Sequence, residues 1–328
     1  MGKSKMKAAS KKKSAVNPPK AKKPYNLIMP VCYSRKYLNE LYREAGFKDT
    51  ESRMLRKVMK GFSNLTGTYP VKEIWDYLET AQPGRFTKQQ FIEFLKVARY
   101  ENEGYALLSY DDFHGRENFS DPMRSELVNL AILPRTNEVY DCSRYDQIKN
   151  TVAWLQVLPD PENTPIEFFA DDAALPASKG IDNLIGLLTF TFFHNLEAAT
   201  RVVEHLYRLI QVYGISLNQC LGPKGLGTCW KTVEQVVGKE TAMTCLTDFY
   251  TSVCCYDLHG SSLRIYVECL YDHGPEAEKV DPEFTLVPDK TISEMREIIE
   301  TEHNKKHPYR QTLVKGFYTE ARYSVAFE

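Results

Sequence analysis

The sequence predicts a mainly α-helical protein with a minor β component, and three observations lead to this fold class. Apolar residues recur at spacings of three and four in several stretches, which is typical of helices that pack through one face. Stretches with the composition of strands are few and short. With 328 residues and 43% hydrophobic content, the chain can bury one large core or two ordinary ones.

The first 24 residues predict a disordered basic tail, because they contain nine lysines, three prolines and no acidic residue. Helices and short strands then alternate. Ser34 and Thr87 are suitable N-caps for the first and fourth helices, and Gln82-Pro83-Gly84 is a turn. The predicted helices cover residues 34–45, 50–62, 71–79 and 88–100. The predicted strands lie within residues 65–70, 105–109 and 127–133.

The order of these elements over residues 50–135 is helix, short strand, helix, tight turn, helix and strand, and it resembles a winged helix-turn-helix. The resemblance implies a winged-helix-like domain over residues 25–157, with the 88–100 helix facing a DNA groove. The outer face of that helix carries a mixed set of side chains, Gln89, Glu93, Lys96 and Tyr100. Groove-reading helices usually carry more basic and amide side chains, so this face departs from the pattern.

The second domain is expected to be acidic and mainly helical, over residues 158–328. It begins with a Pro-containing stretch at 158–165 that predicts a linker. Asn195 can cap a helix that ends at Tyr213, before Gly214, and the apolar residues of this helix form one seam. Further helices are predicted at residues 184–193, 239–256 and 292–304.

The spacing of apolar residues and loops from residue 25 to about 270 resembles a group of uncharacterised bacterial proteins. Those proteins combine a winged-helix-like N-terminal domain with a helical C-terminal domain. The resemblance implies this architecture and a bacterial origin, and it implies no activity. Some members end in a small Cys-rich zinc module, which this chain lacks, so a zinc-dependent role is not carried over.

Charge is distributed unevenly along the chain. The first 60 residues carry 17 Lys+Arg and 4 Asp+Glu, a balance of +13, whereas the remaining 268 carry 25 and 39, a balance of −14. Such asymmetry favours a basic arm that meets a polyanion. The lysines of the tail are compatible with a nucleic-acid arm, a localisation signal or a solubilising extension. Lysine without arginine favours attraction to phosphate over reading of bases.

The strongest local pattern is a basic face on the second predicted helix. At 100° per residue, Arg53, Arg56, Lys57 and Lys60 fall within an arc of about 100°, with no acid among them. Cations so arranged could each displace a counterion from a phosphate backbone. An ordinary solvated helix face explains the pattern equally well.

The candidate motifs for metal or cofactor binding lack the residue spacing or the number of ligands that such sites require. Six of the eight cysteines fall within residues 220–269, but none has the two-to-four-residue spacing of zinc ligands. His303 and His307 lack a third ligand. The glycine-rich stretch at 221–228 lacks the P-loop spacing and is expected to connect two helices. We therefore expect no metal and no cofactor.

Catalytic motifs are also weak. Residues 168–172 look like the Phe-x-Asp-Asp signature of reverse transcriptases, but no earlier strand offers the third carboxylate of a two-metal site. Asp171 and Asp172 are instead expected to end or cap an element. No run approaches the ~18–20 apolar residues of a membrane span, and no secretory signal is recognisable. A cytoplasmic location without membrane contact is expected.

These observations predict a non-enzymatic nucleic-acid-binding or regulatory protein. It is expected to contact the phosphates of nucleic acid, with DNA as the favoured partner. A protein-interaction module with an incidental tail is the alternative, and an enzyme whose site is formed only by the fold is a third reading. The acidic domain is expected to serve for a protein partner or for dimerisation. The candidate nucleic-acid-binding residues are Lys11, Lys12, Lys13, Lys20, Lys22, Lys23, Arg53, Arg56, Lys57, Lys60, Gln89 and Lys96.

Overall fold

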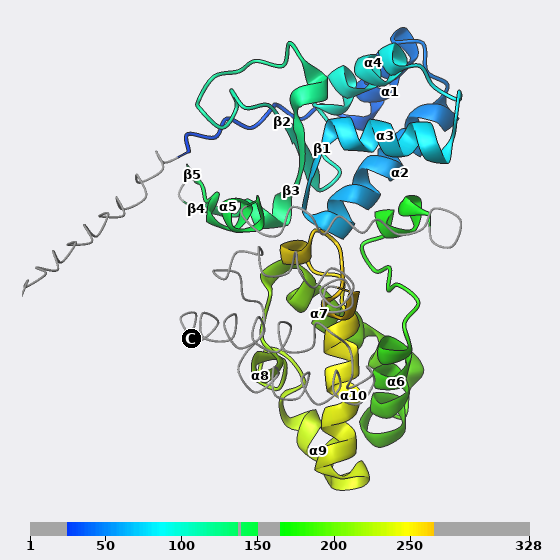
Figure 1. The fold of residues 1–328 in the computed structure, drawn as a ribbon, viewed down its shortest axis with the longest axis vertical. Coiled ribbons are helices and arrows are strands. Elements are labelled where there is room, and N and C mark those ends of the chain that lie inside the picture. Colours follow the sequence, from blue (N-terminus) through cyan, green and yellow to red (C-terminus); the bar gives the residue numbers. More distant parts are fainter. Residues whose placement is uncertain (1–24, 137–138, 150–164, 266–328) are drawn as a thin grey trace, which may run out of the picture.

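A computed structural model of the chain describes residues 25–136, 139–149 and 165–265, and it is mainly helical with a small antiparallel sheet (Figure 1). The predicted fold class is confirmed at this level. The basic tail, the 158–164 part of the linker and the 292–304 helix lie outside the described residues. Within the described ranges, no helix combines the length and apolar character that a membrane crossing requires.

The N-terminal half of the described chain has the predicted alternation of helices and short strands. Its helices are α1 (Arg35–Glu44), α2 (Asp49–Thr66), α3 (Val71–Ala81), α4 (Lys88–Ala98) and α5 (Ser143–Lys149), with the 3-10 turns η1 (Pro122–Arg124) and η2 (Leu130–Ile132). Its strands are β1 (Thr68–Pro70), β2 (Tyr105–Leu108), β3 (Glu126–Asn129), β4 (Arg135–Thr136) and β5 (Val139–Tyr140). Ser34 and Thr87 cap α1 and α4 as predicted, each accepting a backbone N–H through its hydroxyl.

The main sheet has the strand order β1-β3-β2, with β3 antiparallel to both neighbours. Leu127 pairs with Tyr69 on one side and with Leu107 on the other. The third predicted strand ends at Asn129, earlier than expected, because the Asn129 side chain accepts from the N–H of Ala131 and starts η2. A separate two-stranded ribbon joins β4 and β5.

The core of the N-terminal half is largely aromatic. The Phe94 ring stacks on Tyr42 at 5.4 Å between centroids and lies 6.2 Å from Phe91. A later segment, η3 (Ile166–Ala170), also contributes Ile166 to this core. Its close approach depends on Gly61 of α2, where a Cβ atom would lie 2.1 Å from the carbonyl oxygen of Ile166.

The C-terminal half is a bundle of helices around its own apolar cluster. Its elements are α6 (Lys179–Leu188), η4 (Thr189–Phe193), α7 (Leu196–Tyr213), α8 (Leu217–Cys220), α9 (Gly227–Val237), α10 (Lys239–Ser252) and η5 (Tyr256–Leu258). Asn195 caps α7 through the N–H of Ala198, and Gly214 ends it in the left-handed region, both as predicted. Residues 221–226 connect α8 to α9, so the predicted helix-to-helix connection at 221–228 is confirmed except for residues 227 and 228, which begin α9.

Two helix predictions in this half need correction. The predicted 184–193 helix changes to a π-helical turn at η4, where the Thr189 and Thr191 hydroxyls donate to carbonyls four residues earlier. This turn leaves Phe190 72% exposed rather than buried. The predicted 239–256 helix ends at Ser252, because Val253 is extended and the following residues form η5.

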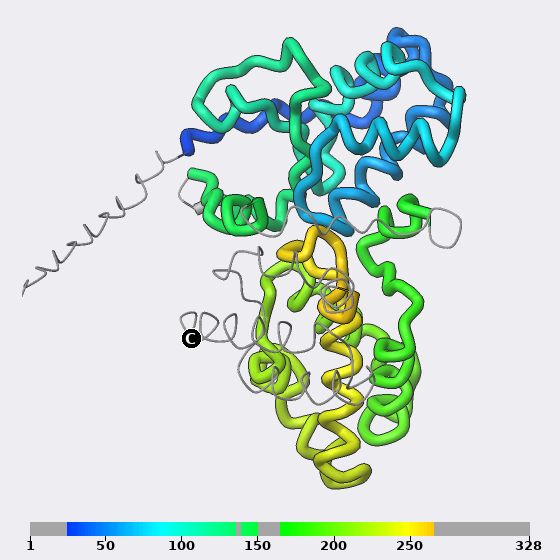
Figure 2. The backbone as a smooth tube through the Cα atoms, in the orientation of Figure 1, coloured from blue at the N-terminus to red at the C-terminus, as the bar shows by residue number. Residues whose placement is uncertain are grey.

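The two halves meet through η5 and the end of α2. Tyr256 packs against Gly67, where a Cβ atom would lie 2.6 Å from the tyrosine ring. Arg144 of α5 donates to both carboxylate oxygens of Asp257, at 2.7 and 2.5 Å, and also to the carbonyl of Val212. Figure 2 shows η5 and the residues around it, in orange, directly beneath the N-terminal half.

Candidate nucleic-acid interface

The predicted basic face exists on α2, opposite the side that packs into the core. Arg53, Arg56, Lys57 and Lys60 all line one surface hollow of about 380 Å³. The predicted arc lacked acids because α2 itself contributes none there. In the folded chain, however, carboxylates reach the same hollow from other elements, Glu103, Glu167 and Asp171.

Arg56 is largely engaged inside the protein. Its side chain is 15% exposed, and its guanidinium lies 3.8 Å from both Glu101 and Glu103. It also lies 5.7 Å from the centroid of the Tyr42 ring, a cation–π arrangement. The buried Glu101 carboxylate accepts hydrogen bonds from Tyr42 at 2.9 Å and Arg35 at 3.0 Å. Arg56 therefore belongs to a charge-balanced cluster and offers little free charge to a ligand.

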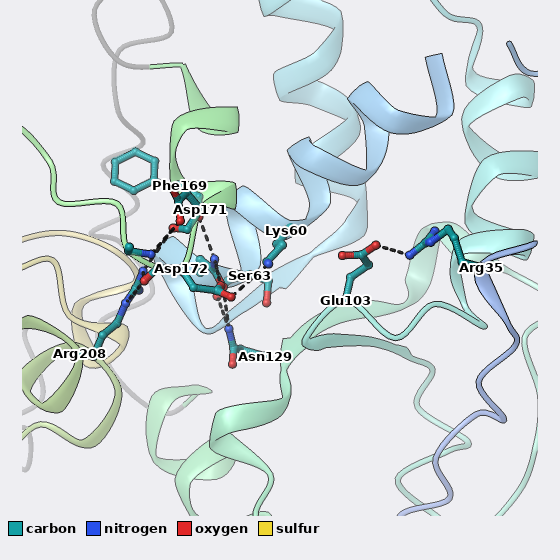
Figure 3. Close-up of polar contacts among 11 residues, drawn as sticks. Arg35, Lys60, Ser63, Glu103, Asn129, Phe169, Asp171, Asp172 and Arg208 are labelled. Atoms are coloured by element: carbon teal, nitrogen blue, oxygen red, sulfur yellow. Dashed lines mark hydrogen bonds and ion pairs between the residues drawn. The ribbon is translucent and has the colours of Figure 1, made fainter. Parts of the chain in front are cut away.

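Lys60 takes part in a polar junction with Asp172, which lies shortly after η3 (Figure 3). Its ammonium lies 3.2 Å from the Asp172 carboxylate, which also accepts from Asn64 at 2.9 Å. Asn64 in addition donates to the carbonyl of Phe169, and Asn129 of β3 donates to the side-chain oxygen of Asn64. The positive charge of Lys60 is therefore partly neutralised by Asp172, whose carboxylate also accepts a hydrogen bond from Asn64.

Arg53 and Lys57 differ from the other two cations. Both are exposed, and neither has an ion-pair partner within 4 Å among the residues that the structure describes. They stand one turn apart on the same helix face, so a polyanion could contact both together. Two of the four predicted cations thus present their charge outward.

Gln89 and Lys96 lie on a different helix, α4, and not on the α2 face. Both donate to the same carboxylate oxygen of Glu93, at 2.8 Å each. The hydrogen bond from Lys96 lowers the pKa of Glu93 below its ordinary value. This face is internally paired, which matches its mixed composition. The tail residues Lys11, Lys12, Lys13, Lys20, Lys22 and Lys23 lie outside the described residues.

Asp171 ends an element as expected, whereas Asp172 caps none and instead makes contacts to Lys60, Asn64 and Arg208. Asp171 follows η3 as its C-cap residue and accepts from the N–H of Ala173 at 2.9 Å. Asp172 joins the halves, since its backbone carbonyl accepts from Arg208 of α7 at 2.7 Å. No group of three or more metal-ligating side chains is assembled within the described ranges.

The structure has a second hollow, of about 360 Å³, that the sequence analysis did not predict. Tyr25, Tyr110, Phe113, His114 and Tyr145 line it, together with Arg124 and Lys149. Only the aromatic content of residues 110–114 could have indicated it, because Tyr25 and Tyr145 are brought there by tertiary contacts.

A function for this chain has to account for exposed cations on α2, a lysine-rich N-terminal segment and an aromatic hollow. Arg56 and Lys60 of α2 are paired with carboxylates of the protein, whereas Arg53 and Lys57 point to solvent. The paired carboxylates lie up to 112 residues away in the sequence. Comparison with known protein families, curated proteins and solved structures finds no match to this chain.

Proposed function

We propose that the protein is a non-enzymatic nucleic-acid-binding protein that holds phosphates through its lysine-rich tail and through Arg53 and Lys57. The observation that carries the proposal is the concentration of unbalanced charge: nine lysines and no acid in the first 24 residues. Each lysine near a phosphate releases a condensed counterion, which makes such a segment attractive to nucleic acid of any sequence. The exposed pair on α2 adds fixed positions to this attraction.

We further propose that residues 50–135 form a winged-helix-like domain. The order α2, β1, α3, α4, β2, β3 and the strand order β1-β3-β2 support this proposal, as does the turn at residues 82–84 between α3 and α4. On this proposal α4 would be the helix that faces a groove. Its outer face is paired through Glu93, which favours backbone contacts over base reading.

A protein-interaction module remains the second candidate, because one part of the C-terminal half exposes large apolar side chains. Phe190 is 72% exposed and Leu196 is 64% exposed, and they lie six residues apart at the η4–α7 junction. Exposed apolar side chains mark a contact surface for another protein where they form one contiguous patch. Replacing both with serine should then abolish association with a partner while leaving binding to nucleic acid unchanged.

The test of the nucleic-acid proposal is the salt dependence of binding. Full-length protein is titrated against a fluorescein-labelled 20-base-pair DNA duplex by fluorescence anisotropy between 50 and 200 mM salt. The salt dependence is the slope of the logarithm of the association constant against the logarithm of the salt concentration. The double variant Arg53→Gln/Lys57→Gln should make this negative slope shallower by about 1.8, roughly 0.9 for each lost phosphate contact. Replacing Lys11, Lys12, Lys13, Lys20, Lys22 and Lys23 with glutamine should flatten it further.

The matched control is Lys231→Gln, an exposed lysine on α9 in the C-terminal half. It should leave the slope unchanged, because a charge away from the proposed surface contacts no phosphate. If the full-length protein binds neither duplex nor single strand at 50 mM salt, the proposed function is wrong.

A further inference from the structure

The aromatic hollow lies where three separate parts of the chain meet. Tyr25 comes from the start of the described chain, Tyr110 and His114 from the connection between β2 and β3, and Tyr145 from α5. An isolated bridge between Asn26 and His114 holds the first of these parts against the second. The volume, about 360 Å³, falls within the range of small-ligand sites, roughly 300–1,000 Å³.

One ring pair at this hollow is open to solvent. Tyr110 is 70% exposed, and its ring stacks on His114 with 4.1 Å between centroids and 27° between planes. The His114 Nδ1 atom lies 2.8 Å from the carbonyl oxygen of Tyr110, which fixes the imidazole orientation. His114 therefore supports one face of the Tyr110 ring, while most of the Tyr110 side chain stays open to solvent.

Behind this pair the other rings form a rigid wall. Phe113 stacks on Tyr145 at 4.6 Å, and Tyr25 packs against Phe113 at 5.4 Å. The two phenols donate to carboxylates, Tyr25 to Asp146 at 2.7 Å and Tyr145 to a Glu126 oxygen at 2.6 Å. Burial raises the pKa of both phenols, so they stay protonated and keep these bonds.

The charges of the described side chains that line the hollow are largely paired. Lys149 pairs with Glu126, while Arg124 at the rim pairs with Asp121 at 3.1 Å. Figure 1 shows the described chain beginning, in dark blue, beside the β4–β5 ribbon and away from α2.

We propose that this hollow binds an unpaired nucleobase of a single-stranded nucleic acid, with the base on the exposed Tyr110 ring and a neighbouring phosphate facing Arg124. The inference rests on the proposed function and names the form of nucleic acid that the protein prefers. Every base has a π-face, so such a site accepts single strands of many sequences. A base inside a duplex is already stacked between its neighbours and cannot reach an aromatic side chain.

The experiment compares Tyr110→Ala and Tyr110→Phe in the full-length protein. Binding of fluorescein-labelled 15-nucleotide dT, 15-nucleotide dA and a 15-base-pair duplex is measured by anisotropy at one low salt concentration. Tyr110→Ala should weaken binding to both single strands about 5- to 150-fold, since stacking on an aromatic side chain contributes this much per base. It should leave duplex binding unchanged, and Tyr110→Phe should retain single-strand affinity because the ring remains.

Tyr213→Ala is the matched control, since this tyrosine is 61% exposed on α7 in the C-terminal half. It should bind like the wild type, and thermal unfolding should show each variant folded. If the wild type binds single strands and Tyr110→Ala binds them equally well, the inference is overturned while the proposed function stands. If the wild type binds no nucleic acid at low salt, the proposed function fails and the inference with it.

Discussion

Individual cysteines illustrate how burial can dominate the pKa of a side chain. Burial raises the pKa of Cys220 to about 12 and that of Cys254 to about 11. At neutral pH these thiols are protonated and behave as small apolar side chains of the C-terminal core. Cys254 is partly buried and packs against that core.

The same burial predicts a loss of stability at alkaline pH. The unfolded thiol has the ordinary pKa of 9.0, and Cys220 has a pKa of about 12 in the folded protein. Below pH 9 both states hold the proton and the full stability is present. As the pH rises above 9, the unfolded state releases the proton first, so stability falls by about 1.4 kcal/mol per pH unit for this group.

Urea unfolding between pH 8 and 11 measures this effect. Cys220→Ala should show a shallower decline above pH 9 than the wild type, although it is less stable at pH 8 because a buried atom is lost. Equal declines in the two proteins would contradict the assignment of this slope to Cys220.

The ion pairs of α2 mark the limit of sequence reasoning at the scale of single residues. Helical geometry predicted that Arg53, Arg56, Lys57 and Lys60 share one face of the helix, and in the structure all four line one hollow. Whether each charge is free depends on Glu101, 45 positions after Arg56, and on Asp172, 112 positions after Lys60. No local pattern encodes pairing over such separations, because it follows from how whole elements pack.

At the scale of elements, two glycines in α6 are expected to respond oppositely to the same substitution. A Cβ atom on Gly180 would lie 2.4 Å from the carbonyl oxygen of Asp248 in α10, whereas one on Gly186 would meet nothing within 4 Å. Gly186→Ala should stabilise the protein by ~0.5–1 kcal/mol, because alanine loses less backbone entropy in a helix. Gly180→Ala should destabilise it by ~1–3 kcal/mol, because α6 must move away from α10.

Each glycine variant serves as the control for the other, and urea unfolding at pH 7 measures both. If Gly180→Ala is as stable as Gly186→Ala, the contact between α6 and α10 is looser than the structure indicates.

Elements with strong end signals were predictable, and elements shaped by distant contacts were not. The caps at Ser34, Thr87 and Asn195 place the starts of α1, α4 and α7 correctly. The π-helical turn at η4 was missed, because hydrophobic periodicity assumes a continuous α-helix through Phe190. Threonine hydroxyls that bond to the preceding turn are compatible with either helix type, so the sequence offers no way to decide.

For the whole molecule, the pair between Arg144 and Asp257 is the contact expected to hold the two halves most strongly. The Asp257 side chain is fully buried and that of Arg144 is 16% exposed. Burial raises the pKa of Asp257, and the neighbouring Arg144 opposes this rise. Arg144→Ala should destabilise the protein by about 3–5 kcal/mol, because it leaves a buried carboxylate without its partner.

Urea unfolding of three proteins tests this contact. Arg264→Ala, which removes a half-exposed pair with Asp248, should cost at most about 1 kcal/mol. The double variant Arg144→Ala/Asp257→Ala should recover part of the stability lost in Arg144→Ala, since no unpaired charge remains. A loss below 1 kcal/mol for Arg144→Ala would show that the halves are held by other contacts.

The position of η3 determines how the protein can be divided into fragments. Ile166 fills the N-terminal core although it is encoded after the predicted linker, and Tyr77 of α3 lies 3.5 Å from its backbone nitrogen. An N-terminal fragment that stops before Ile166 would therefore expose the apolar side of α2 that η3 covers. The chain should therefore be divided after Ala170 rather than within the linker when fragments are produced. The same boundary applies to any exchange of halves between related chains.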